Sequence, residues 1–116
     1  MAHFVIEHSN AFHESSDVIH AMETVFDVGS ESGIIFGDDI KVRAIPFEHF
    51  LFGNHMNCFI HVTVSMLTGR TDSQKERLSI ALRSALDEQF PKVQSISIDV
   101  RDMNPVAYKK RLLDLN

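Results

Sequence analysis

Apolar and polar residues alternate along four short stretches of the chain, as in strands with one buried face. The clearest stretch follows a Gly-Asn-His turn and covers residues 57–66, with apolar side chains at every second position. The others cover residues 2–8, 40–47 and 93–101. In the stretch 40–47, Lys41 and Arg43 fall on the face opposite the apolar one. Pro46 in that stretch favours a strand at the edge of a sheet.

Two longer segments repeat apolar residues at helical spacing. The first begins near Ser15 or Ser16, and Gly29 is a suitable place for it to end. The second begins after Thr71, which forms a capping-box pattern with Gln74, and continues to Phe90-Pro91. A short third helix is expected from Asn104-Pro105 to Leu113, because proline suits the first helical position.

The elements follow one another as strand, helix, strand and again strand, helix, strand. Because a right-handed crossover makes its two strands parallel, each half predicts a β-α-β unit. We therefore expect a single α/β (α+β) domain over residues 1–116, with a four-stranded mixed sheet and two helices on one face. The other sheet face, which carries Val5 and Thr63, would be left uncovered. Association of subunits is a natural way to cover it.

The composition narrows the function classes. The net charge is −5 at pH 7, which argues against nucleic acid and against anionic membranes as partners. Cys58 is the one cysteine, so no disulfide can form within the chain, and a reducing setting is expected. The first residues lack a signal-peptide pattern, and no apolar run approaches the roughly 20 residues of a membrane span. These features together favour a cytoplasmic protein.

The sequence contains no recognised motif for a metal or a cofactor. Seven histidines are present, yet none pairs with the cysteine at a metal-ligand spacing. The glycines do not form a phosphate-binding loop either, since Gly69 precedes Arg70 alone. We therefore expect no metal site and no cofactor.

Three cationic side chains are candidates for binding a carboxylate. Arg70 directly precedes the second helix, where free backbone N–H groups favour anions and a guanidinium can grip a carboxylate with two hydrogen bonds. Lys41 and Arg43 share one strand face and could line a pocket for an acidic ligand. The alternative is that all three are solvated surface residues, as most lysines and arginines are.

The start of the first strand offers a candidate base. Removal of Met1, which the small Ala2 permits, would leave a free amine at the head of this strand. An unperturbed α-amine titrates at about 7.7–8.0, and nearby cations increase its neutral fraction. A neutral amine can act as a general base. The alternative is an ordinary exposed terminus.

Several segments together resemble the 5-carboxymethyl-2-hydroxymuconate isomerase family of the tautomerase superfamily. They are the start Ala2-His3-Phe4-Val5-Ile6-Glu7, the strand segments Ile40-Lys41-Val42-Arg43 and Phe59-Ile60-His61-Val62-Thr63, the pair Gly69-Arg70, and the tail Asn104-Pro105. The resemblance implies a tautomerase-like fold of doubled β-α-β subunits assembled as a homotrimer. It also implies a proton-shuttling amino-terminal proline and arginines that hold the substrate's carboxylates.

Carried onto this sequence, the family pattern places Ala2 where the proline stands. Arg70 matches the Gly-Arg arginine, and the second arginine aligns with Lys41 or, after a small shift, with Arg43. The resulting hypothesis is an isomerase that moves a double bond in an unsaturated oxo-acid with two or three carboxylates, within aromatic-compound catabolism. The rival hypotheses are a non-catalytic relative that binds an acidic metabolite and a protein-interaction module with a ferredoxin-like fold.

Overall fold

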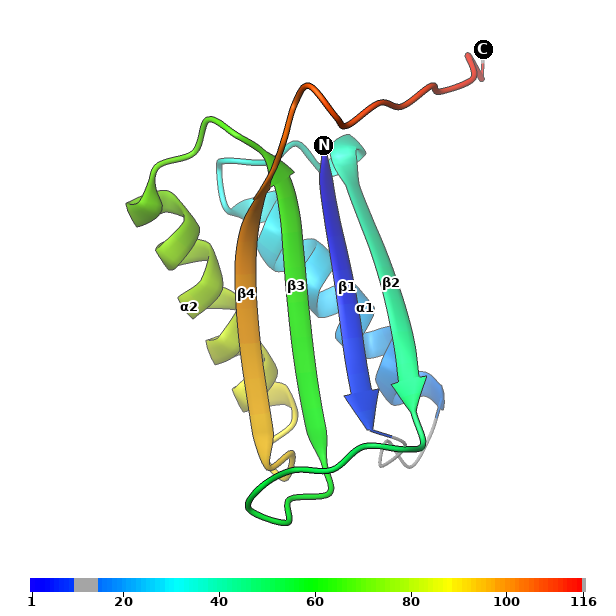
Figure 1. Ribbon diagram of the computed structural model, residues 1–116, viewed down its shortest axis with the longest axis vertical. Helices are drawn as coiled ribbons and strands as arrows, with labels where there is room; N and C mark the ends of the chain where they lie inside the picture. The colour runs from blue at the N-terminus through cyan, green and yellow to red at the C-terminus, as the bar shows by residue number, and fades with distance from the viewer. Residues whose placement is uncertain (10–14, 116) are drawn as a thin grey trace.

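The computed structural model describes residues 1–9 and 15–115 and contains two β-α-β units in succession (Figure 1). The elements are β1 (Ala2–Ser9), α1 (Ser15–Glu31), the short 3-10 helix η1 (Gly37–Asp39), β2 (Ile40–Phe47), β3 (Phe59–Leu67), α2 (Asp72–Gln89) and β4 (Ser95–Met103). The predicted bounds of β2 are confirmed, whereas β3 and β4 each begin two residues later than the alternation indicates.

The strands form one mixed sheet in the order β2-β1-β3-β4. β1 is parallel to β2, β3 is parallel to β4, and the central pair β1–β3 is antiparallel. Both helices cover the same face of the sheet (Figure 1). The predicted fold class is therefore confirmed, and β2 is an edge strand that tolerates Pro46.

The core lies between the sheet and the helices and uses every second residue of the central strands. Phe4, Ile6, Ile60, Val62 and Val64 are fully buried there. α2 contributes Leu78, Leu82 and Leu86 from one face. Because burying one large aliphatic or aromatic side chain contributes about 1.5–3 kcal/mol, this layer supplies most of the stabilisation of the fold.

Gly29 does not end α1, contrary to the sequence prediction, because the helix continues to Glu31. A Cβ atom at position 29 would lie 2.8 Å from Phe4 Cζ and 3.2 Å from Ile40 Cδ1. The glycine thus allows α1 to approach the sheet closely. The pattern of breakers in the sequence cannot distinguish such a contact from a helix stop.

The start of α2 agrees with the sequence prediction. Thr71 Oγ1 accepts a hydrogen bond from the Gln74 backbone N–H at 3.1 Å, and Gln74 Oε1 accepts one from the Thr71 N–H at 2.9 Å. This reciprocal capping box fixes where the preceding loop ends.

The third helix expected from Asn104 to Leu113 is absent. The Asn104 carbonyl accepts hydrogen bonds from the N–H groups of Ala107 and Tyr108, and this single turn is followed by an extended tail (Figure 1). Leu112 and Leu113 remain exposed, so no apolar face packs against the sheet. A short helix without such packing is marginal in water.

Candidate active site

The sheet face opposite the helices carries the candidate residues Lys41 and Arg43. In the first row across this face, Lys41 pairs with His3, His3 with Ser65, and Ser65 with Arg101. In the next row, Arg43 pairs with Val5 and Val5 with Thr63. The sequence prediction that Lys41 and Arg43 share a face is thus confirmed, and the register places both beside β1 at its amino-terminal end.

Positive charges from three parts of the chain act on the ring of His3. They are those of Arg43 and Lys41, of the amine at the chain start, and of Lys110. We call His3, Lys41, Arg43 and Lys110 the cationic cluster. It stands out because the whole chain carries a net charge of −5. Such a concentration of positive charge favours an anionic ligand.

His3 is held on both sides by hydrogen bonds. Arg43 Nη1 donates to His3 Nδ1 at 3.1 Å, since a guanidinium has no acceptor. His3 Nε2 lies 2.9 Å from the Tyr108 hydroxyl, and the two rings meet edge to face with centroids 5.7 Å apart. These contacts attach the start of the carboxy-terminal tail to the open sheet face.

The surroundings of His3 favour its neutral ring. Partial burial lowers the pKa of His3 below the ordinary 6.5, and the positive charges of Arg43 and Lys41 lower it further. The neutral ring is also the form that can accept the Arg43 hydrogen bond at Nδ1. Electrostatics and hydrogen bonding therefore select the same protonation state.

Ala2 occupies the first position of β1, between Ile40 of β2 and Met66 of β3. Its side chain is fully buried on the helix side of the sheet, while His3 next to it points to the open face. The backbone nitrogen of Ala2 therefore lies at the sheet end that also carries the cationic cluster. In the described structure Met1 precedes it, so this nitrogen is an amide.

Arg70 is neither a solvated side chain nor a member of the cationic cluster. Its Nε and Nη2 donate to the Ile34 carbonyl at 3.2 and 2.8 Å, and its Nη1 donates to the Leu67 carbonyl at 3.1 Å. Gly69 before it has a φ of 128°, which lets the chain turn sharply after β3. Arg70 thus ties the loop after α1 to the loop after β3. A guanidinium has five N–H groups, so two remain for another partner.

The candidate residues therefore lie at one end of the sheet but in two places. Lys41 and Arg43 meet around His3 on the open face, whereas Arg70 lies between two loops beside the helices. Sequence reasoning missed the roles of His3, Tyr108 and Lys110. The alternation of polar and apolar residues does place His3 on the open face. The contact with Tyr108 could not be predicted, because the tail was expected to be a helix.

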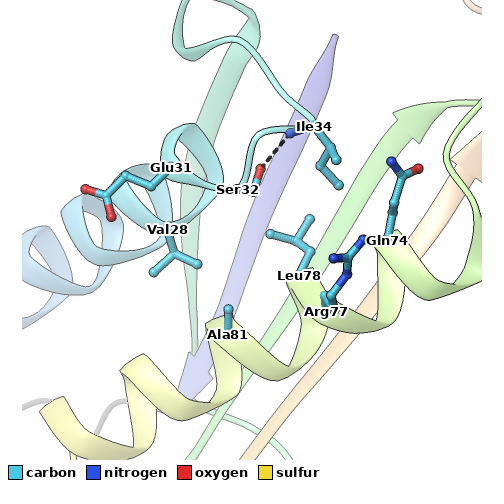
Figure 2. A pocket seen from close by; sticks show the side chains of 8 residues that line it. All are labelled: Val28, Glu31, Ser32, Ile34, Gln74, Arg77, Leu78 and Ala81. Atoms are coloured by element: carbon cyan, nitrogen blue, oxygen red, sulfur yellow. Dashed lines mark hydrogen bonds between the residues drawn. The ribbon is translucent and has the colours of Figure 1, made fainter.

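Among the described residues, several hollows lie away from this cluster. A cleft of about 410 Å³ separates α1 from α2 and is lined by Val28, Glu31, Ser32, Ile34, Gln74, Arg77, Leu78 and Ala81 (Figure 2). Within it, the Ile34 N–H donates to Ser32 Oγ at 3.3 Å (Figure 2). A second hollow, of about 430 Å³, lies at the far end of the open face, where Phe47, Phe50 and Phe52 surround Phe59.

Among residues 1–9 and 15–115, no group of three or more His, Cys, Asp or Glu side chains is arranged to hold a metal ion. Neither α1 nor α2 has the length and apolar character that crossing a membrane requires.

Comparison of the sequence with protein families matches residues 2–111 to 5-carboxymethyl-2-hydroxymuconate isomerase. The chain belongs to this family. The match spans both β-α-β units and reaches into the tail, so it covers the cationic cluster as well as the core. A search among curated proteins gave no match.

Solved structures share the fold at low sequence identity. A 5-carboxymethyl-2-hydroxymuconate isomerase from Deinococcus radiodurans R1 has a TM-score of 0.81 at 16% identity, over 95% of this chain and 88% of that one. Pt0534, solved after inactivation by 2-oxo-3-pentynoate, has a TM-score of 0.80 at 17% identity, over 93% and 91%. A macrophage migration inhibitory factor-like protein from Entamoeba histolytica has a TM-score of 0.78 at 14% identity, over 95% of each chain.

The family match and the fold of the similar solved structures agree. The family is one of isomerases, so the expectation of an enzyme of the tautomerase type is confirmed at this level. The resemblance noted in the sequence is likewise confirmed.

Proposed function

We propose that the protein catalyses a 1,3-proton transfer in an unsaturated oxo-acid with two or three carboxylates, as a cytoplasmic step of aromatic-compound catabolism. The amine of Ala2, freed by removal of Met1, is the base in this proposal. Lys41, Arg43 and Arg70 bind the carboxylates. The family match supports the reaction class.

The observation that carries the proposal is the cationic cluster at the start of β1. A substrate with several carboxylates needs several positive groups, and Lys41, Arg43 and Lys110 all act on His3. The same charges stabilise the negative charge that develops on the substrate's oxygen when a proton leaves carbon.

Arg70 has a double role in this proposal. Three of its N–H groups fix the two loops at the chain-start end of the sheet. The remaining two N–H groups are available to a carboxylate that extends past β1. Lysine at position 41 keeps the positive charge but binds a carboxylate without the bidentate geometry of arginine.

We further propose that three chains assemble through the open sheet face. Val5 and Thr63 lie at the centre of this face, which neither α1 nor α2 covers (Figure 1). Covering such a face with a second copy buries area that one small domain leaves exposed. Similar folds include a fused 4-OT solved as a symmetric trimer, with a TM-score of 0.77 at 14% identity, over 88% of this chain and 85% of that one.

The test is a ketonisation assay with a dienol dicarboxylate, on protein whose first residue is shown by mass spectrometry to be Ala2. Lys41→Gln and Arg43→Gln should each lower kcat/KM about tenfold, which corresponds to about 1.4 kcal/mol. Lys92→Gln is the matched control, because Lys92 is exposed and precedes β4 at the other end of the sheet. Equal kcat/KM in all four proteins would refute the role of the cluster.

One outcome would favour a different function. The cationic cluster does not need the amine of Ala2 in order to hold an anion. If the wild-type chain binds a dicarboxylate through Lys41 and Arg43 but turns over no dienol, the protein is a binder of acidic metabolites rather than an isomerase.

A further inference from the structure

The hydrogen bonds around His3 fix which atom donates and which accepts at each contact between Arg43 and Tyr108. Arg43 can only donate, so His3 Nδ1 carries no proton in this arrangement. The neutral ring then carries its proton on Nε2, which donates to the Tyr108 hydroxyl oxygen at 2.9 Å. The hydroxyl therefore accepts from His3 and keeps its own hydrogen for another acceptor.

No acceptor for that hydrogen occurs within the described part of the chain. His3 Nε2 is the one hydrogen-bond partner that the structure gives to the Tyr108 oxygen among residues 1–9 and 15–115. Tyr108 is half-buried, and Lys110 two residues on contributes to the cationic cluster. A free donor of this kind, bonded to His3 beside Arg43, suits a ligand oxygen that is negative or becomes negative.

We propose that the Tyr108 hydroxyl donates a hydrogen bond to the carbonyl oxygen of the bound oxo-acid and stabilises the dienolate formed from it. This inference rests on the proposed function and adds a catalytic residue to it. The carboxylates of the same ligand are held by Lys41 and Arg43, and the oxo group lies between them and the tail.

The electron balance of the step is simple. The base removes a proton from the carbon beside the carbonyl group, and the C–H electron pair forms a C=C bond while the C=O electron pair moves to oxygen. The Tyr108 hydrogen bond strengthens as that oxygen gains charge, but its proton stays on tyrosine. The protonated base then returns its proton two carbons away, and the carbonyl group re-forms.

Tyr108 can be observed selectively, because the chain contains one tyrosine and no tryptophan. Titration with 2-oxoadipate should change the tyrosine fluorescence, and adipate, which lacks the oxo group, should change it less. In calorimetry, Tyr108→Phe should weaken 2-oxoadipate binding about fivefold and leave adipate binding unchanged. In the ketonisation assay the same variant should lower kcat about 10–100-fold at nearly constant KM, since the lost bond strengthens in the transition state.

The outcomes separate the two proposals. If the wild type binds neither probe, the carboxylate site fails, and the role of Tyr108 fails with it. If both probes bind and Tyr108→Phe binds them as the wild type does, the role of Tyr108 alone is overturned. If the variant weakens both probes equally, Tyr108 only holds the tail in place, which also overturns the inference.

Discussion

Arg43 Nη1 lies 3.1 Å from His3 Nδ1, so a cation on the edge strand holds the imidazole of the neighbouring strand in one tautomer. Lys41 pairs with His3 from the same edge strand, and Ser65 and Arg101 lie in its row on β3 and β4. From the tail, Tyr108 contacts His3 and the charge of Lys110 acts on it. Asp99 pairs with Arg101 and offsets its charge. The net field at His3 is therefore positive.

We expect Arg43→Gln to raise the pKa of His3 toward 6.5, because the change removes the strongest of the neighbouring positive charges. Lys92→Gln should leave it unchanged. The measurement is an NMR titration of the imidazole, assigned with a His3→Gln variant, in which ¹⁵N shifts also report the tautomer. A His3 pKa that is the same in Arg43→Gln and wild type would contradict the contact.

The same pKa shift predicts how His3 affects stability with pH. Its pKa is lower in the folded than in the unfolded chain, so the unfolded chain binds more protons between the two values. The contribution of His3 is fully present above about pH 6.5, the unfolded value, and is lost as the pH falls through the folded pKa. Denaturant unfolding of wild type and His3→Gln between pH 7.5 and pH 4.5 would reveal the difference.

Gly29→Ala should destabilise the fold by about 1–2 kcal/mol. The new methyl group would overlap with Phe4, which is fully buried and cannot move aside. Overpacking of this kind costs about 1–3 kcal/mol, and the better helix propensity of alanine offsets at most about 1 kcal/mol. Gly53→Ala is the control, because a Cβ atom there meets nothing within 4 Å. An unchanged denaturation midpoint in Gly29→Ala would show that α1 can shift away from the sheet.

Arg70→Ala should lower the free energy of unfolding by about 1–3 kcal/mol, because the hydrogen bonds to the Ile34 and Leu67 carbonyls are lost. Arg70→Lys keeps the charge but cannot span both carbonyls, so it should recover only part of this loss. Arg83→Ala, at an exposed position on α2, should stay within about 0.5 kcal/mol of wild type. Equal stabilities of Arg70→Ala and Arg83→Ala would leave Arg70 without a structural role.

Thr63→Glu should shift the protein from trimer to monomer in light scattering coupled to size-exclusion chromatography. Thr63 is at the centre of the open face, where a buried carboxylate without a partner is costly. Ser84→Glu adds the same charge at an exposed position on α2 and should leave the trimer intact. A monomeric wild type, or a trimeric Thr63→Glu variant, would argue against assembly through this face.

Much of the fold follows from local patterns. Alternation alone puts Phe4 and Ile6 on one face of β1 and His3 on the other, and a polar capping box marks the start of α2. Lys41 and Arg43 could be assigned to a common face for the same reason. Each of these features depends on residues close together in sequence, which is where pattern arguments are strongest.

Contacts between residues far apart in the chain could not be predicted from the sequence. Tyr108 reaches His3 only because β4 carries the tail past the start of β1, and no local pattern encodes that path. Arg70 binds backbone carbonyl groups, which every residue has. The sequence therefore cannot indicate which carbonyls are its partners. Gly29 was predicted to end the helix because local sequence does not show its close neighbours. These are Phe4 and Ile40, which belong to other elements.

The role of the Ala2 amine can be tested by comparing two preparations of the same chain. One is processed to a free Ala2, and the other carries an acetyl group on that nitrogen, which removes its basicity without changing any side chain. Calorimetry with adipate should give the same affinity for both, which shows that the carboxylate site is intact. In the dienol ketonisation assay, the acetylated protein should be slower by about 100-fold or more, the usual contribution of a general base. Equal rates for the two preparations would contradict the amine's role as the base.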